Sequence, residues 1–348
     1  MITAIILGGS HVWREDCLES VCPRLLLPVL NAPLVSYTLA WLRGAGVNQV
    51  VICANDATHF VRARFQEGAD QGVELYYYED HTPRGPAGCS RDAAALVGAD
   101  HYVIVEGSVL PALDLRGLLR FHERTGAAAT VVAQPAEHDG DGLDGNLCPA
   151  GIYVVARRTL EQVPPLGYQD LKEVLIPRLY RQREWVVVYP AEAQSPRLKD
   201  LGSYLAVQGW MLARLAGRDM TDEGYAWRGA AGSAKSDCAL LHRTARVAEG
   251  AKLVGQVMLG PGSRVDDEAI IVGPTVMGRD GVVGRRALVK RSVLWDASAV
   301  EERASLDQCL MVSGSSAVAG VSHHGAICPP QGPARVWWRR LQGQAGRA

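Results

Sequence analysis

Two different hydrophobic patterns divide the chain near residue 217. Before that point, short apolar runs rich in β-branched residues alternate with amphipathic stretches of helical period. The apolar runs, which predict strands buried on both faces, are residues 3–7, 49–54, 73–78, 101–106 and 129–134. Residues 33–46 and 114–126 predict helices that end at glycines. This alternation indicates an α/β domain over residues 1–216, with a parallel sheet and ligands at the carboxyl ends of its strands.

A six-residue period governs the second part of the chain. Apolar residues recur every six positions from Val247 to Val289, and after a slip of one residue the period continues from Leu294 to Val318. A small or β-branched residue follows four positions after each of the first set. Neither an α-helix nor an ordinary strand has this period, whereas one flat side of a left-handed parallel β-helix does. The pattern predicts a β-helix of about four coils over residues 247–325.

The stretches beside the β-helix carry no such period. Residues 217–246 are polar and rich in small residues, and they are predicted to be a linker. Residues 326–348 form a basic tail in which Trp337 and Trp338 precede two arginines. This tail either packs back on the β-helix or touches a membrane surface or a partner.

Composition excludes several classes of function. The net charge is −1 and charged residues make up 21%, so neither nucleic acid nor an anionic membrane is an expected partner. The eight cysteines lack C-x-x-C spacing, which disfavours a zinc site and a disulfide framework. Without a signal peptide or an apolar run long enough to span a bilayer, the chain is expected to be cytoplasmic, with no transmembrane segment.

Four motifs occur in an order that is specific as a set. They are PRLLLPV at the start of residues 23–52, RGPAGC at 84–89, PAGIYVV at 149–155 and KDLGSYL at 199–205. They resemble, in turn, the P-K-P-L-L-P-V segment, the base-recognition loop, the sugar-loop strand and the metal-binding D-V-G of the sugar-1-phosphate nucleotidyltransferases (NDP-sugar pyrophosphorylases). The mannose-1-phosphate guanylyltransferases and glucose-1-phosphate nucleotidyltransferases are the most similar group. The resemblance implies a Rossmann-like nucleotidyltransferase domain followed by a left-handed β-helix.

The resemblance also implies a reaction and a set of site residues. An NTP and a sugar 1-phosphate would give an NDP-sugar and pyrophosphate, with Mg²⁺ as cofactor, in nucleotide-sugar and polysaccharide biosynthesis. Arg14 aligns with the arginine on the leaving group and Arg24 with the lysine on the α-phosphate. The implied nucleotide-binding residues are Leu7, Gly8, Gly9, Gly85, Gly88 and Glu106. Gly151, Lys172 and Glu173 would bind the sugar phosphate, and Asp200 and Glu106 would hold the metal.

Several residues depart from the family pattern at positions that carry chemistry. Ser10 and Val12 replace glycines of the phosphate turn, and a β-branched residue rarely adopts positive φ. Ser108 replaces the first metal aspartate, and a hydroxyl is a poor Mg²⁺ ligand beside a carboxylate. Pro149 replaces the asparagine of the sugar loop and removes an amide. These departures predict weakened or lost catalysis.

Three functions therefore stay open. The first is a divergent nucleotidyltransferase, and the second is a non-catalytic nucleotide-sugar-binding subunit that regulates or scaffolds an active relative. Both would form homo- or hetero-oligomers through the β-helix. The third is a hexapeptide acyltransferase with His323 or His324 as general base. Simpler roles compete at each site: Arg14 as a surface charge, Asp200 as a helix cap, and Gly85 and Gly88 as residues of a tight turn.

Overall fold

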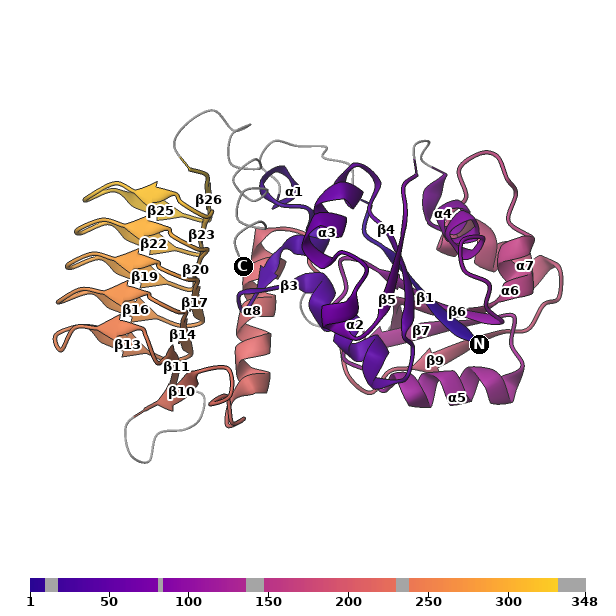
Figure 1. Cartoon of the computed structure of the whole chain (residues 1–348), viewed down its shortest axis with the longest axis horizontal. Helices are drawn as coiled ribbons and strands as arrows, with labels where there is room; N and C mark the ends of the chain where they lie inside the picture. The colour runs from indigo at the N-terminus through magenta and orange to yellow at the C-terminus, as the bar shows by residue number, and fades with distance from the viewer. Residues whose placement is uncertain (10–17, 81–83, 136–146, 230–237, 331–348) are drawn as a thin grey trace. The chain divides into compact units, whose positions relative to one another are not determined.

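The computed structural model describes residues 1–9, 18–80, 84–135, 147–229 and 238–330 (Figure 1). The chain forms two compact units, and neither is one continuous segment. The first comprises residues 1–11, 23–26 and 34–197, and the second comprises 12–22, 27–33 and 198–348. This division differs from the predicted boundary after residue 216, because the last long helix belongs to the second unit.

A seven-stranded sheet in the order β5-β4-β1-β6-β8-β7-β9 forms the centre of the first unit. Its strands are β1 (Ile2–Leu7), β4 (Gln49–Cys53), β5 (Glu74–Tyr78), β6 (His101–Glu106), β7 (Ala129–Pro135), β8 (Leu147–Ala156) and β9 (Val186–Pro190). All five strands predicted from apolar runs are present. However, β8 runs antiparallel to both β6 and β7, so the sheet is mixed and not wholly parallel as predicted.

Helices cover both faces of this sheet (Figure 1). The helices and helical turns of the unit are η1 (Arg24–Leu26), α2 (Leu34–Gly44), η2 (Asn55–Ala57), α3 (Thr58–Phe65), η3 (Ala69–Gln71), α4 (Gly85–Ala94), α5 (Leu115–Thr125), α6 (Arg157–Glu161), η4 (Leu171–Leu175) and α7 (Ile176–Arg181). Successive residues of β1 point to opposite faces: Ile6 joins the core beneath α2 and α5, and Ile5 joins the core beneath α4. Both side chains are fully buried, which explains the continuous apolar runs in the sequence.

The second unit contains the β-helix, built from three parallel sheets (Figure 1). The first sheet consists of β10 (Tyr225–Arg228), β11 (Ala239–His242), β14 (Val257–Leu259), β17 (Thr275–Met277), β20 (Val293–Leu294), β23 (Leu310–Met311) and β26 (Ile327–Cys328). The second consists of β12 (Arg246–Val247), β15 (Arg264–Val265), β18 (Val282–Val283), β21 (Ala299–Val300) and β24 (Ser316–Ala317). The third consists of β13 (Lys252–Val254), β16 (Ile270–Val272), β19 (Leu288–Lys290), β22 (Ser305–Asp307) and β25 (Ser322–His324). In the first of these sheets, β10 runs antiparallel to β11.

The α/β domain followed by a β-helix is therefore confirmed, and the β-helix is longer than predicted. Two of its sheets have five strands each, which exceeds the predicted four coils. The coils begin at β11, inside the stretch predicted as a linker, where Leu241 pairs with Leu259. They also continue beyond residue 325, because Cys328 of β26 pairs with Met311. In the last coil, His323 takes the inward place beside Leu306, where the apolar period has no residue.

The register of the last coils differs from the prediction. Leu294 pairs with Met311, and Val300 pairs with Ala317, so the chain slips by one residue a second time after Leu306. Met311 and Ala317 point into the core, while Val318 is 47% exposed. The prediction that Val318 continues the inward stack is wrong. In these coils one turn between strands is shorter by one residue, so each coil has 17 residues in place of 18. A strict six-residue period therefore predicts the wrong inward residues.

A long helix and a small hairpin pack within the second unit. α8 (Leu201–Leu215) lies near the hairpin of β2 (Pro28–Val29) and β3 (Ala32–Pro33), while α1 (Leu18–Val21) is a short turn. The Tyr204 hydroxyl donates to the Pro28 carbonyl at 2.6 Å and accepts from the indole of Trp295 at 2.8 Å. Gln208 Nε2 donates to the same carbonyl at 2.9 Å. These hydrogen bonds connect the hairpin, α8 and the β-helix.

No helix in the described part of the chain is long and apolar enough to cross a membrane. The basic tail from residue 331 onward, with its two tryptophans, lies outside the described residues.

Candidate functional site

A cavity of about 200 Å³ lies at the carboxyl ends of β1 and β4. It is lined by Leu7, Gly9, Cys53, Asn55, Asp80, Gly85, Pro86, Cys89 and Tyr168. From β1 the chain proceeds to β4 and β5 on one side of the sheet, and β6 is added on the other side. Open α/β sheets bind ligands at such a reversal of strand order. The cavity therefore lies where the sequence predicted a ligand.

The loop that begins α4 forms one wall of this cavity. Gly85 has φ of 76°, and a Cβ at this position would lie 2.6 Å from the carbonyl oxygen of Gln169. Two backbone hydrogen bonds hold the loop: Ala87 N–H donates to Gln169 at 2.9 Å, and Gln169 N–H donates to Arg84 at 2.7 Å. Gly85 is thus required for both conformation and space. Gly88, the second predicted glycine, is buried in the first turns of α4 and does not line the cavity.

The two glycines after β1 have different roles. Gly8 is buried, donates its N–H to the Cys53 carbonyl at 2.7 Å, and leaves no room for a Cβ because Leu25 packs against it. Leu25 is 1% exposed, so Gly8 serves core packing. Gly9 lines the cavity, and a Cβ there would lie 2.7 Å from the side-chain amide of Asn55. The predicted phosphate turn continues into residues 10–17, which include Ser10, Val12 and Arg14 and lie outside the described residues.

One carboxyl group and two thiols belong to the cavity wall. Asp80 is 8% exposed, and its Oδ2 accepts a hydrogen bond from the Arg84 N–H at 3.2 Å. Cys53 and Cys89 are both buried. A hydrogen bond to Cys89, together with burial, raises the pKa of the Cys53 thiol well above its usual value. Cys53 is therefore an uncharged thiol at neutral pH and a poor nucleophile.

Glu106 ends β6, the neighbour of β1, and is the centre of an ionic cluster. Its Oε1 lies 2.9 Å from Lys172 Nζ and accepts a hydrogen bond from the Tyr153 hydroxyl at 3.3 Å. Its Oε2 accepts a charge-assisted hydrogen bond from the Arg197 guanidinium. Burial raises the pKa of Glu106, but the attraction of Arg197 and Lys172 outweighs it and the pKa is lowered overall. The carboxylate therefore stays ionised, with both oxygens engaged.

The backbone fixes the partners of Glu106. Arg197 forms an isolated antiparallel bridge with Val109, three residues beyond β6. Gly151 in β8 has φ of 78°, and a Cβ there would lie 2.5 Å from the Arg197 guanidinium. A glycine at this position is therefore required to admit the arginine. The backbone of Lys172, the second partner of Glu106, is also fixed. Asp170 caps η4 by accepting hydrogen bonds from the backbone N–H groups of Lys172 and Glu173.

Asp200, the predicted second metal ligand, caps a helix. Its Oδ1 accepts hydrogen bonds from the Ser203 N–H at 2.8 Å and the Ser203 hydroxyl at 2.7 Å. The Ser203 hydroxyl oxygen in turn accepts from the Asp200 N–H at 2.9 Å, which completes a capping box at the start of α8. These bonds lower the pKa of Asp200. The simpler role considered for Asp200 is therefore present in the structure.

The residues predicted to hold Mg²⁺ do not fit that role well. Both oxygens of Glu106 face cationic side chains, and the Oδ1 of Asp200 is committed to its helix. In the described part of the chain, no group of three or more His, Cys, Asp or Glu side chains is arranged to hold a metal ion. Mg²⁺ binds through carboxylate oxygens, so a carboxylate already neutralised by two cations is a poor ligand.

The other predicted residues have less defined surroundings. Arg24 is partly buried at the start of η1, and the Glu173 side chain is exposed on η4. His324 Nδ1 lies 3.6 Å from the Asp307 carboxylate, and His323 occupies the inward register of the last coil. Both histidines therefore have structural neighbours in the β-helix.

The structure adds Asp80, Arg197, Tyr153 and Tyr168 to the candidate residues. Asp80 had a signal in the sequence, because it lies two residues after the run 73–78, at the carboxyl end of a predicted strand. Arg197 lies two residues before the KDLGSYL motif but carries no motif of its own. Its role depends on the bridge to Val109, which joins segments far apart in the sequence.

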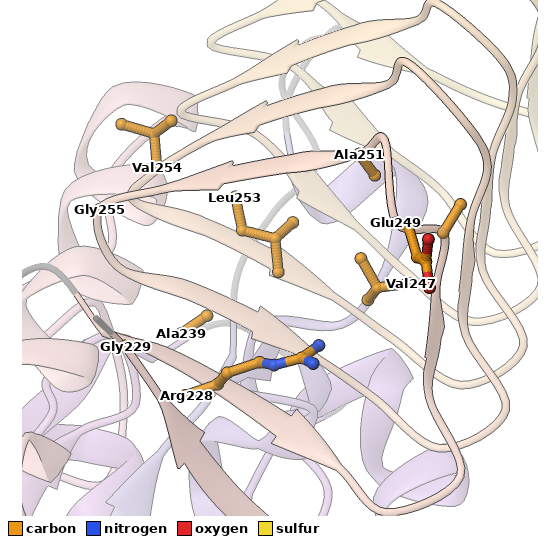
Figure 2. Close-up of a pocket in the computed structure, with 10 residues that line it drawn as sticks. Arg228, Gly229, Ala239, Val247, Glu249, Ala251, Leu253, Val254 and Gly255 are labelled. Atoms are coloured by element: carbon orange, nitrogen blue, oxygen red, sulfur yellow. The ribbon is translucent and has the colours of Figure 1, made fainter. Parts of the chain in front are cut away.

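A larger hollow of about 680 Å³ lies at the first coil of the β-helix (Figure 2). Its lining is mainly apolar, with Val247, Ala251 and Leu253 beside the charged Arg228 and Glu249. β12 and β13 each pair with only one neighbouring strand, so this hollow is the end of the apolar core. It brings together no constellation of catalytic groups among the described residues.

Comparison with known proteins agrees with the motifs. Residues 3–141 match the nucleotidyl transferase family. A mannose-1-phosphate guanylyltransferase of Mycobacterium tuberculosis is 25% identical over 325 residues, covering 86% of this chain and 81% of its own. The chain is a relative of the sugar-1-phosphate nucleotidyltransferases. Among other relatives, a UTP–glucose-1-phosphate uridylyltransferase of Synechocystis is 21% identical over 85% of this chain and 83% of its own.

A shorter match and a solved structure are each similar to part of this chain. A glucose-1-phosphate thymidylyltransferase of Mycolicibacterium smegmatis is 34% identical over 158 residues, 40% of this chain and 51% of its own. The crystal structure of a Bacillus anthracis protein assigned as a glucose-1-phosphate thymidylyltransferase, in complex with sucrose, superposes with a TM-score of 0.52. It has 16% identity and covers 60% of this chain and 95% of that chain. This similarity confirms the fold of the α/β domain.

Proposed function

We propose that this chain binds a nucleotide and a sugar 1-phosphate, and transfers the nucleotidyl group slowly. The cavity at the carboxyl ends of β1 and β4 is the observation that carries this proposal, because it joins the Gly85 loop to the strand ends. At about 200 Å³ it suits a nucleobase better than a whole nucleotide. The phosphates would then lie toward β6, where Lys172 and Arg197 provide positive charge.

Guanine is the first candidate for the base. The Asp80 carboxylate on the cavity wall is a pure acceptor, and guanine presents two adjacent donors, N1–H and the 2-amino group. Uracil and thymine present a single ring N–H, and adenine lacks a ring N–H on its Watson–Crick edge. The name of the Mycobacterium tuberculosis relative points to the same base. Mannose 1-phosphate is therefore the first sugar phosphate to test.

The chemistry would consist of alignment and charge neutralisation. A phosphate oxygen of the sugar 1-phosphate attacks the α-phosphorus of the NTP, the α–β phosphoanhydride bond breaks, and pyrophosphate leaves. Cationic side chains at the phosphates reduce the repulsion between these two anions. Lys172 and Arg197 would fill that role, with the Arg197 guanidinium beside Gly151 on the sugar-loop strand.

A non-catalytic binding subunit is the second candidate. It is favoured by Glu106, whose oxygens are engaged by two cations, and by Ser108, which is 5% exposed where the family has an aspartate. Such a subunit would sense or store a nucleotide sugar and would pair through its β-helix with another copy or an active relative. Both candidates place the chain in nucleotide-sugar biosynthesis and in the cytoplasm.

Calorimetric titration of the full chain with GTP, UTP, dTTP, ATP and CTP, followed by an assay of released pyrophosphate, tests the proposal. Mannose 1-phosphate and glucose 1-phosphate serve as acceptors. Binding of one nucleotide with pyrophosphate release supports the enzyme, and binding without release supports the binding subunit. If none of these nucleotides binds, and GDP-mannose and UDP-glucose titrated in the same way do not bind either, both candidates are wrong.

A further inference from the structure

The ionic cluster of Glu106, Lys172 and Arg197 lies beside the cavity proposed for the base. Glu106 pairs in register with Leu7, which lines the cavity. Neighbouring strands lie roughly 5 Å apart, so the cluster is one strand away from the cavity wall. Lys172 follows Tyr168, another lining residue, by four positions. A ligand that fills the cavity and extends along the sheet would meet the cluster next.

The net charge of the cluster is positive. Two cations share one carboxylate, and the side chains of Glu106, Arg197 and Lys172 are 21%, 23% and 41% exposed. Only one guanidinium nitrogen of Arg197 is engaged by Glu106, and an arginine carries five N–H donors. Both cations are therefore held by Glu106 while keeping donors for an incoming anion. A guanidinium and an ammonium are the groups that proteins use to bind phosphate oxygens.

Positioning of the guanidinium is built into the backbone. The bridge between Arg197 and Val109 fixes where the side chain begins, and a second bond from the Leu110 N–H to the Pro196 carbonyl, at 2.9 Å, supports it. Gly151 leaves the space that the guanidinium occupies. An arginine held in this way loses little conformational entropy when an anion binds.

We infer that the Lys172–Arg197 pair, held by Glu106, binds the diphosphate of the nucleotide directly and without a divalent cation. Glu106 is thus a positioning residue for two cations and not a metal ligand. This inference rests on the proposed function, because it assigns the phosphate end of the same site. In this site, the cationic side chains of Lys172 and Arg197 would neutralise the diphosphate in place of Mg²⁺.

Titration of the full chain with GDP and with inorganic pyrophosphate, in EDTA and in Mg²⁺, tests the inference. Binding of both probes is expected to persist in EDTA. Lys172→Ala and Arg197→Ala should each weaken binding roughly tenfold to a hundredfold, since each removes a charged hydrogen-bond donor. Arg197→Lys, which keeps the charge but not the planar fork, should recover part of the loss.

Two further variants separate this inference from a metal site. Glu106→Gln leaves both cations and removes a negative charge that repels the anion, while the bridge to Val109 still positions Arg197, so binding of pyrophosphate in EDTA should persist. A metal ligand would show the opposite, a loss of binding in Mg²⁺. Lys290→Ala is a matched control, because Lys290 lies 3.2 Å from Asp307 in the β-helix with a similarly exposed side chain, and it should change nothing.

The outcomes distinguish the two proposals. Binding that needs Mg²⁺ and is lost in Glu106→Gln would overturn the inference while the proposed nucleotide site stands. If neither GDP nor pyrophosphate binds, with or without Mg²⁺, both the inference and the proposed function are wrong. Thermal unfolding of each variant without ligand shows whether a loss of binding reflects a loss of fold.

Discussion

At the scale of single residues, glycines and one aspartate define the candidate site. Gly85 and Gly151 both have positive φ, and in both cases a Cβ would collide with a neighbour that shapes the site. Gly8, by contrast, gives its space to Leu25 in the core. Glycines that look equivalent in a motif thus serve backbone conformation, side-chain access or packing, depending on what lies opposite.

Asp80→Asn tests the assignment of guanine. The amide keeps the size of the carboxyl group but replaces one acceptor by a donor, which opposes the donors of guanine. The variant should lose roughly 1.5–3 kcal/mol of GDP affinity, while its affinity for pyrophosphate stays unchanged. Comparison of GDP with IDP, which lacks the 2-amino group, provides the control: the wild type should prefer GDP and the variant should not. An equal loss of affinity for GDP and for pyrophosphate would indicate damage to the fold.

His122 predicts a pH dependence of stability. It is 1% exposed, and its ring nitrogens lie 2.8 Å from the Thr130 hydroxyl and 3.1 Å from His101. Burial, with smaller contributions from the charges of His101 and Arg158, lowers its pKa to about 4. The unfolded chain therefore binds the proton more readily. Neutral His122 therefore contributes on the order of 3 kcal/mol to the free energy of unfolding. This contribution is complete above about pH 6.5 and is lost as the pH falls toward 4.

The free energy of unfolding, measured by denaturant titration between pH 7 and pH 4, checks this expectation. His122→Gln retains hydrogen-bonding groups but does not titrate, so its curve should be flatter than that of the wild type over this range. Identical curves for the two proteins would show that His122 does not titrate on unfolding.

At the scale of elements, the start of α8 distinguishes a cap from a metal ligand. Asp200→Ala removes the capping side chain and should cost about 1 kcal/mol of unfolding free energy. Asp200→Asn keeps a capping acceptor and should cost little, although it removes the charge that a metal needs. Unfolding measured in EDTA gives the capping effect alone. If both variants are equally destabilised there, the capping box does not stabilise α8.

The β-helix offers a test of register with one substitution at two positions. Val300 is fully buried in the inward stack, whereas Val318, which a strict six-residue period would place inside, is 47% exposed. Val300→Ala should cost about 2 kcal/mol, because it removes buried methyl groups and leaves a cavity. Val318→Ala should cost less than about 0.5 kcal/mol. The reverse order of costs would restore the register expected from the sequence.

At the scale of the whole molecule, the boundary that the sequence suggests after residue 216 lies inside a compact unit. α8 and residues 27–33 belong to the same compact unit as the β-helix, and Trp295 of the β-helix donates a buried hydrogen bond to Tyr204 of α8. A fragment of residues 217–348 lacks both α8 and the hairpin, so it would expose Trp295, which is 4% exposed in the full chain.

The fragments 1–216 and 217–348 should therefore unfold at a lower temperature than the full chain. They should also bind a dye that reports exposed apolar surface. A fragment of residues 198–348 keeps α8 but still lacks the hairpin, and its stability should be intermediate. Calorimetric unfolding of the full chain and of the fragments 217–348 and 198–348 ranks these three proteins. Equal transition temperatures would show that the contacts around Tyr204 do not stabilise the unit.

The sequence alone determined the class of the α/β domain and of the β-helix. Runs of apolar residues indicate strands because a strand covered on both faces needs no polar side, and a six-residue period fits only the flat side of a β-helix. Motifs in order were sufficient to identify the relationship with the sugar-1-phosphate nucleotidyltransferases. These features are local, and local features can be read along one chain.

Only the tertiary structure decided which charges meet. Glu106, Lys172 and Arg197 are separated by up to 91 residues, and their pairing depends on the bridge beside Val109 and on the space at Gly151. The antiparallel insertion of β8, the second slip of the β-helix and the assignment of α8 are likewise outcomes of packing. A carboxylate at a strand end predicts an ionised group, but its partners are set by chain segments that no local pattern connects.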